Sequence, residues 1–250
     1  MEIPTPGKYF AVFFLLITPV LLPVDSGLAQ EEKKSFFRFS SNKKAKKEDK
    51  PQLGVASGAV HIPLELRDIA QDGAELISRG KWKEARELYL KMVLQAPGNP
   101  LAYANLGVAE YQLKNYTEAE RNLKKSLDLN SSIAQNWMTL GLIQFERGEL
   151  LLAISSLTRA IHEDPKSAQA HLYLAAVAYD YGWTNAAIKE LNQVVDLDAK
   201  NSEAHFNLAM TYLGLRPPRL ELARRHYETA KDLGAPPHPG IEEIMKKSSE

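Results

Sequence analysis

The chain has 250 residues, 44% of them hydrophobic, which is enough to bury a substantial core. Its 31 basic and 31 acidic residues give a formal net charge of zero, so no overall field attracts nucleic acid, and we expect no nucleic-acid partner. The absence of cysteine excludes disulfides, thiolate metal ligands and cysteine nucleophiles.

The N-terminal region predicts export. Residues 9–24 form an apolar run that two prolines interrupt. A membrane-spanning helix needs about 20 apolar residues, so this shorter run is more typical of a secretory signal peptide. Gly27 and Ala29 are spaced as at a cleavage site, which predicts a signal peptide over residues 1–29. We therefore expect a periplasmic or envelope-associated protein, or alternatively one that an uncleaved segment anchors to the membrane.

Residues 30–60 have a different composition. Between residues 31 and 50 there are eight basic and four acidic residues, interspersed with Phe36, Phe37 and Phe39. Such a stretch cannot bury enough apolar surface to fold, and it predicts a disordered basic linker. The alternative is a weak contact of this linker with an anionic surface, in which the phenylalanines act as shallow apolar anchors.

Small residues then recur with a period of 34 residues. Glycine or alanine occupies one such position five times, at Gly73, Gly107, Gly141, Ala175 and Ala209. Alanine occupies a second position four times, at Ala85, Ala119, Ala153 and Ala187. The apolar spacing around each pair fits two short amphipathic helices joined by a turn, and neither helix could bury its apolar face alone. The sequence therefore predicts a stacked helical array.

The motif of this repeat is specific. It reads Trp137-x2-Leu140-Gly141 and then Ala153-x3-Leu157. This pattern and its period resemble the tetratricopeptide repeat. The resemblance implies an all-α fold, a right-handed α-solenoid of about five helix-turn-helix repeats over residues 61–235. The first helix of each repeat would line the concave face of this solenoid.

The last repeat departs from the period. Two extra residues fall at positions 216–219, which include a proline pair, and predict a longer turn between its two helices. Beyond it, Ile241, Ile244 and Met245 form a narrow apolar stripe. Because an open end of a repeat array needs a cover, we expect a capping helix within residues 236–250.

No motif for catalysis, metal binding or a cofactor is present, and we expect a protein that is not an enzyme and has no cofactor. His171 and His205 share the repeat position that Tyr103 and Trp137 hold in neighbouring copies. That equivalence identifies the two histidines as packing residues and not as metal ligands.

The concave groove is the candidate site. Aromatic and amide side chains fall at its inward positions, where they could contact an apolar ligand surface and hydrogen-bond a ligand backbone. The candidate residues are Asn105, Tyr111, Gln135, Met138, Phe145, Gln169, Leu172, Tyr173, Tyr179, Phe206 and Asn207. We expect the wall to be apolar and nearly uncharged. It lacks the lysine and arginine set with which the family's best-known clamp holds a C-terminal carboxylate, so that function is not carried over.

These features favour a non-enzymatic adaptor in the cell envelope that binds a peptide or helical segment of other proteins. Two alternatives stay open. The array could associate with itself as a structural protein, or it could be an accessory or regulatory subunit of a secreted hydrolase or a glycan-assembly complex.

Overall fold

The structure, a computed structural model, describes residues 64–247, so the predicted signal peptide and basic linker lie outside the described residues. Within this range the chain forms eleven helices and no strand. They are α2 (Leu64–Ser78), α3 (Trp82–Gln95), α4 (Pro100–Gln112), α5 (Tyr116–Leu129), α6 (Ala134–Glu146), α7 (Leu150–Glu163), α8 (Ala168–Asp180), α9 (Thr184–Leu197), α10 (Ser202–Leu213), α11 (Leu220–Asp232) and α12 (Pro239–Lys247). None of these described helices is both long and apolar enough to span a membrane.

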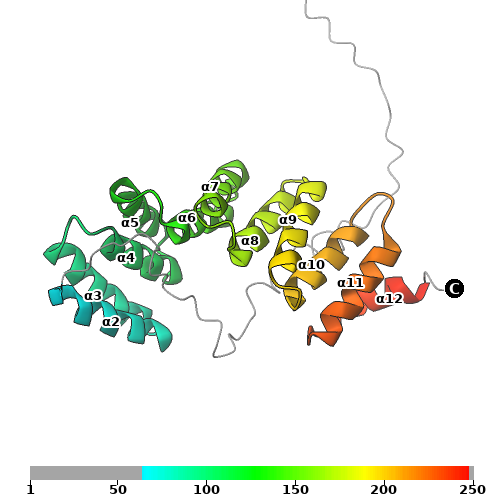
Figure 1. The fold of residues 1–250 in the computed structure, drawn as a ribbon, viewed down its shortest axis with the longest axis horizontal. Coiled ribbons are helices and arrows are strands. Elements are labelled where there is room, and N and C mark those ends of the chain that lie inside the picture. Colours follow the sequence, from blue (N-terminus) through cyan, green and yellow to red (C-terminus); the bar gives the residue numbers. More distant parts are fainter. Residues whose placement is uncertain (1–63, 248–250) are drawn as a thin grey trace, which may run out of the picture.

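The helices follow one another in five pairs along the long axis of the molecule (Figure 1). In each pair the first helix packs on the second, from α2 on α3 to α10 on α11. The helices α4, α6, α8 and α10 begin at Pro100, Ala134, Ala168 and Ser202, which are 34 residues apart. The predicted all-α solenoid of five helix-turn-helix repeats is confirmed.

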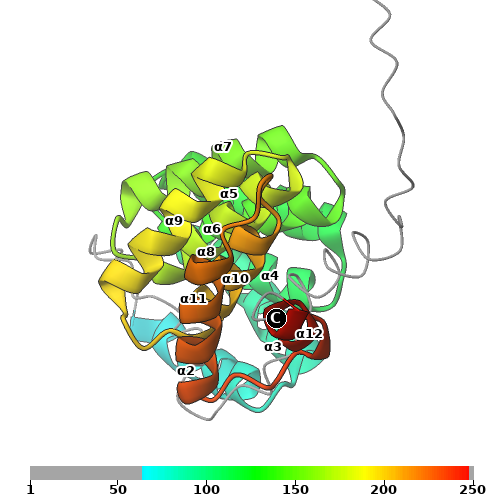
Figure 2. The same ribbon diagram turned by 90° about the vertical axis from the view of Figure 1, so that its right-hand side faces the viewer.

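The first helices of successive repeats lie on the inner side of the array. Helix α4 contacts α6, and α6 contacts α8, whereas no second helix in the described range makes as extensive a contact with the second helix of the next repeat. Viewed from the C-terminal end, α4, α6, α8 and α10 lie towards the axis of the coil and α5, α7 and α9 lie further out (Figure 2). The array therefore curves around its first helices.

Close approach within each repeat depends on the small residues. A Cβ atom added to Gly141 would lie 2.7 Å from Cγ of Leu157 and 3.3 Å from the backbone oxygen of Ala153. A Cβ atom on Gly107 would lie 2.8 Å from Cγ of Leu123. Because a buried core tolerates little added volume, these glycines set the separation of the paired helices.

The turn inside each of the first four repeats requires a left-handed residue at one repeated position. Its φ angle is 71° at Gly80, 63° at Lys114, 75° at Gly148 and 92° at Gly182. In the second repeat the Lys114 amide donates to the Tyr111 carbonyl and the Asn115 amide donates to the Glu110 carbonyl, both at 2.9 Å. This pair of bonds is the Schellman arrangement that ends a helix, and glycine adopts it at least cost.

Helix α12 covers the C-terminal end of the array. Ile241 and Met245 are 1% and 6% exposed and pack in one cluster with residues of α10 and α11, while Ile244 stays 38% exposed. The predicted capping helix is confirmed. The turn before α11 spans residues 214–219, longer than the three-residue turns of the other repeats, as the two extra residues predict.

The packing at Gly141 predicts a large effect of added volume. We expect Gly141→Val to destabilise the protein by about 2–3 kcal/mol, because its side chain would push α6 away from α7. A lower urea midpoint of unfolding, followed by circular dichroism, measures this. Gly98→Ala is the control, since nothing lies within 4 Å of its added Cβ, and equal midpoints for the two variants would contradict the packing role.

The strained turn predicts a stabilising substitution. We expect Lys114→Gly to raise stability by about 0.5–1 kcal/mol, because it removes a left-handed conformation that costs a lysine about 1–2 kcal/mol. The matched control is Lys125→Gly on the exposed side of α5, which should lower stability by about 1 kcal/mol. Thermal unfolding compares the two variants, and a loss of stability in both would show that the turn is not strained.

Candidate functional site on the inner face

We call the surface formed by α4, α6, α8 and α10 the inner face. Three aromatic residues occupy the same position near the ends of three of these helices, at Tyr111, Phe145 and Tyr179, and all are partly buried. Tyr111 packs beside Tyr116, with ring centroids 5.9 Å apart. We call these three residues the aromatic row. Each side chain is anchored against the core and leaves part of its surface accessible.

Tyr173 joins the aromatic row at its centre. Burial raises the pKa of Tyr111 well above its ordinary value of 10, and Tyr173, Glu146 and Tyr116 each raise it further by their negative charge. Tyr111 packs against the cluster that contains Ile143 of α6, and Tyr173 packs in the next cluster together with Phe145 of α6. The fold thus brings tyrosines of α4 and α8 against the intervening first helix, α6.

The predicted amide residues have unequal roles. Gln169 is exposed, and its side chain hydrogen-bonds the hydroxyl of Tyr173; burial raises the pKa of Tyr173, and this contact offsets part of that rise. Gln135 is partly buried, and its Nε2 donates to Oγ1 of Thr139 on the same helix at 3.3 Å. Asn105 is also partly buried. Gln169 is therefore the predicted amide with the most accessible surface.

Met138 is partly buried and packs with Phe145 and Tyr173 against the core between α7 and α8. Its thioether is adaptable and can follow the shape of a bound apolar group. Together with the aromatic row and Tyr173, Met138 forms the apolar part of the inner face.

Three predicted groove residues are buried instead. Leu172 is 4% exposed, and Phe206 and Asn207 are each 2% exposed. Leu172 packs into the cluster that joins α8, α9 and α10. The ring of Phe206 lies 6.5 Å from that of Tyr227, in the cluster that α12 covers. Contrary to the expectation, these three side chains offer almost no surface to a ligand, and Leu172 and Phe206 instead pack within the last repeats.

The charged residues of the inner-face helices are all acidic. The helices α4, α6, α8 and α10 contain four acidic residues and no lysine or arginine. Glu110 and Glu203 are each 3% exposed, so only Glu146, which is exposed, and Asp180, which is partly buried, qualify the expectation of a nearly uncharged wall. Counting charge separately for each predicted helix would have found this imbalance, because the balance of the whole chain conceals it.

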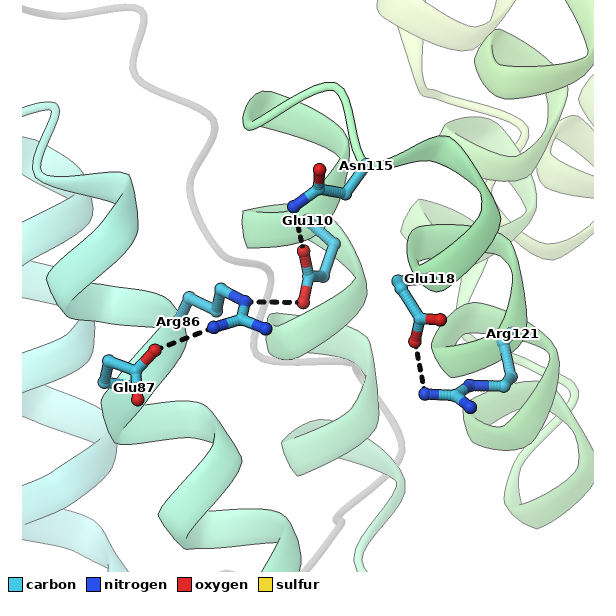
Figure 3. A network of polar contacts seen from close by, with 6 residues as sticks. All are labelled: Arg86, Glu87, Glu110, Asn115, Glu118 and Arg121. Carbon is cyan, nitrogen blue, oxygen red and sulfur yellow. Dashed lines mark hydrogen bonds and ion pairs between the residues drawn. The ribbon is translucent and has the colours of Figure 1, made fainter.

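Glu110 has a structural role at the junction of the first two repeats (Figure 3). It is 3% exposed, and its carboxylate accepts hydrogen bonds of 2.7 Å from Nε of Arg86 on α3 and from Nδ2 of Asn115. Arg86 also donates to the neighbouring Glu87 at 2.7 Å. A buried carboxylate needs such partners, so this contact fixes α3 against α4.

A shallow pocket of about 430 Å³ opens beside this network and is bordered mostly by polar and charged side chains. Its lining residues are Lys83, Glu84, Arg86, Glu87, Leu113 and Asn115. None of the predicted site residues lines it. The pocket therefore does not coincide with the inner face.

The histidines at the shared repeat position make contacts within their own repeats. Nδ1 of His171 lies 2.7 Å from Oε2 of Glu190, and Nδ1 of His205 lies 3.0 Å from Nδ1 of His226. In the part of the chain that the structure describes, no three metal-ligating side chains gather in one place. These contacts are consistent with the predicted packing role of His171 and His205.

Comparison with protein families supplies the classification. Two sequence models of the tetratricopeptide repeat match the chain, over residues 73–132 and residues 144–208. The chain is a tetratricopeptide repeat protein. Proteins of this family generally act as non-enzymatic scaffolds that bind other proteins, which supports an interaction scaffold here.

One curated relative is a TPR repeat-containing protein, MJ1428, of Methanocaldococcus jannaschii. It is 32% identical over 77 residues, which are 31% of this chain and 14% of the relative. The chain thus matches only a small part of that protein. The shared stretch indicates that both proteins contain tetratricopeptide repeats. It carries no information on the activity of the whole relative.

Solved structures with the same fold include PilF of Pseudomonas aeruginosa, with a TM-score of 0.65 and 18% identity over 74% of this chain and 86% of PilF. A MamA double mutant has a TM-score of 0.61 and 18% identity over 69% of this chain and 96% of that one. YrrB, described as a TPR protein with an unusual peptide-binding site, has a TM-score of 0.57 and 21% identity over 72% of this chain and 90% of its own. At these identities the similarity establishes the fold alone.

The His205–His226 contact predicts a loss of stability in acid. Burial, with smaller contributions from the charges of His205 and Arg225, lowers the pKa of His226 from 6.5 to about 4. The unfolded chain therefore binds the proton more readily, and stability present above pH 6.5 is lost as the pH falls towards 4. We expect this group to reduce the free energy of unfolding by about 2 kcal/mol between pH 7 and pH 4.

Urea unfolding at several pH values measures this effect. The variant His226→Gln should show a weaker pH dependence, whereas His162→Gln, at an exposed site on α7, should keep the dependence of the parent protein. Identical pH profiles for His226→Gln and the parent would contradict the assignment.

Proposed function

We propose that the protein is a cell-envelope adaptor whose inner face binds an extended or helical segment of a partner protein. One observation carries this proposal: the aromatic row presents the same kind of side chain at the same position of three consecutive repeats, Tyr111, Phe145 and Tyr179. A peptide lying across the array meets these rings at regular intervals. Aromatic side chains contribute large contact areas at protein interfaces.

The remaining chemistry of the inner face supports a peptide ligand. The exposed amide of Gln169 can both donate to and accept from a peptide backbone. Met138 offers an adaptable apolar contact beside Phe145 and Tyr173. The likeness to YrrB is one of fold, and YrrB is described as having an unusual peptide-binding site.

The envelope location rests on the sequence of the N-terminal region. The apolar run at residues 9–24 and the small residues Gly27 and Ala29 support export. An exported adaptor would meet partners of the envelope or the secreted fraction. This part of the proposal is independent of the inner face and has its own test, the N-terminal sequence of the protein recovered from its native cells.

Charge substitution on the inner face tests the binding role. We expect Met138→Lys combined with Gln169→Lys to reduce capture of an envelope partner at least tenfold, because two cations disturb an apolar, acidic surface. Lysine keeps a long aliphatic stem, so both substitutions preserve packing better than truncation of the aromatic row would. Partners captured from the native envelope fraction are identified by mass spectrometry and then measured as purified proteins.

The matched control adds the same two charges on the outer side of the array. Leu151 is 58% exposed on α7, and Ser155 is exposed on the same helix. Leu151→Lys combined with Ser155→Lys should capture the same partner as the parent protein. A partner that the inner-face variant retains and the control variant loses would refute the proposal.

A further inference from the structure

Charge is distributed unevenly between the two sides of the array. The first helices α4, α6, α8 and α10 carry four acidic residues and no lysine or arginine. The second helices α5, α7, α9 and α11 carry nine acidic and eight basic residues. Glu110 and Glu203 are each 3% exposed, and Arg86 of α3 pairs with Glu110, so the accessible negative charge comes from Glu146, which is exposed, and from Asp180, which is partly buried.

The two accessible carboxylates adjoin the aromatic row. Glu146 directly follows Phe145 at the end of α6, and Asp180 directly follows Tyr179 at the end of α8. Negative charge and aromatic rings thus occupy the same region. A cationic side chain is attracted both by a carboxylate and by the face of an aromatic ring, so the matching ligand is a peptide that combines basic and aromatic residues.

The chain carries a segment of this composition. Residues 33–47 contain seven basic residues and no acidic residue, and three phenylalanines fall within four positions, at Phe36, Phe37 and Phe39. The same combination of seven cations and three aromatic rings does not occur in any helix of the array. The segment is complementary to the inner face in charge and in apolar character.

The length of the intervening chain allows the contact. Residues 48–63 separate this segment from the start of α2, and sixteen residues can extend to about 55 Å. Neighbouring packed helices lie about 8–10 Å apart, so three repeat steps from α2 to α8 amount to roughly 30 Å. The segment can therefore reach the aromatic row of its own chain.

We infer that residues 33–47 bind the inner face of their own chain, with the phenylalanines on the aromatic row and the basic side chains near the inner-face carboxylates. This inference rests on the proposed binding role of the inner face and specifies the chemistry that the face recognises. The segment acts as an internal competitor, and a partner must displace it.

Tethering makes even a weak contact effective. A segment held by a short linker has an effective concentration of about 1 mM at its binding site. If its intrinsic dissociation constant is on the order of 0.1 mM, it lowers the apparent affinity of a competing ligand about tenfold. Partners with a basic, aromatic segment of higher affinity would then be selected over weaker ones.

The absence of cysteine from the chain allows a direct test. Spin labels are attached at Ser40→Cys and Gln112→Cys, the latter at the exposed end of α4 beside Tyr111, and the distance between them is measured by pulsed electron paramagnetic resonance on the full chain. We expect a narrow distance distribution. Replacing the phenylalanines, as F36S/F37S/F39S, should broaden it.

Two controls identify the occupant. A second pair, Ser40→Cys with Lys125→Cys on α5, should give a longer distance, because α5 lies on the outer side of the array. Mixing with a tenfold excess of unlabelled chain should leave the narrow distribution unchanged. A distribution that disappears on mixing would show that the segment of a second copy occupies the face and would overturn the proposal.

Peptide binding supplies the second measurement. A fluorescent peptide of residues 33–47 should bind the F36S/F37S/F39S chain about tenfold more tightly than the parent chain, because the internal competitor is weakened. It should not bind when Met138→Lys and Gln169→Lys are also present. Equal binding to the first two proteins, together with broad distances in both, would overturn internal occupancy.

Failure of internal occupancy would not contradict the proposed function, because the partner-capture experiment tests that function separately. Loss of a captured partner in the Met138→Lys and Gln169→Lys variant would still support the inner face as a binding site for other proteins. Retention of the partner, combined with a docked segment, would instead show that the face serves the chain's own segment alone.

Discussion

The close approach of the two helices within each repeat is the constraint on which the rest of the structure depends. At Gly107 and Gly141 a single added methyl group would meet a leucine of the second helix at less than 3 Å. At Gly73 it would meet the ring of Tyr89 at 2.7 Å. Since a small residue recurs at this position in all five repeats, the two helices of each repeat can pack at a similar separation. The regular spacing of the inner-face side chains is a consequence of that uniformity.

The sequence predicted most of the fold because its strongest signals are local and repeated. The small residues recur every 34 positions, and the turn glycines at Gly80, Gly148 and Gly182 fall at another fixed position of the repeat. Lys114 occupies the same turn position and was not predicted, since nothing about a lysine indicates a left-handed backbone. Its conformation is imposed by the helices on either side.

The candidate site was predicted less completely. Met138, Leu172 and Phe206 share one repeat position and were all predicted to line the groove, yet Met138 is partly buried while the other two are almost fully buried. The difference comes from neighbours that a position in the repeat does not reveal. Phe206 lies under the cluster that α12 completes, and Leu172 is enclosed between α9 and α10. Exposure depends on the ends and the curvature of the array, which are properties of the assembled fold.

Charge is separated between the two layers of helices, although the whole chain is electrically neutral. Among the helices of the last four repeats, lysine and arginine occur only in the outer ones, where acidic residues balance them. The charged residues of the inner helices are all acidic. A neutral total keeps long-range attraction small, while the local imbalance acts at contact distance. Under the proposed function, selection of a ligand would depend on its fit to the inner face and not on long-range attraction.

The ion pair between Arg86 and Glu110 also has a mechanical meaning. Repeats contact mainly their neighbours, so a pull on the N-terminal end of the array reaches the second repeat through the α3–α4 interface. Arg86 and Asn115 hold the buried carboxylate of Glu110 from both sides of that interface. If the array were pulled from that end, this contact would share the tension with the packing of α3 on α4, and the first repeat would transmit it to the second.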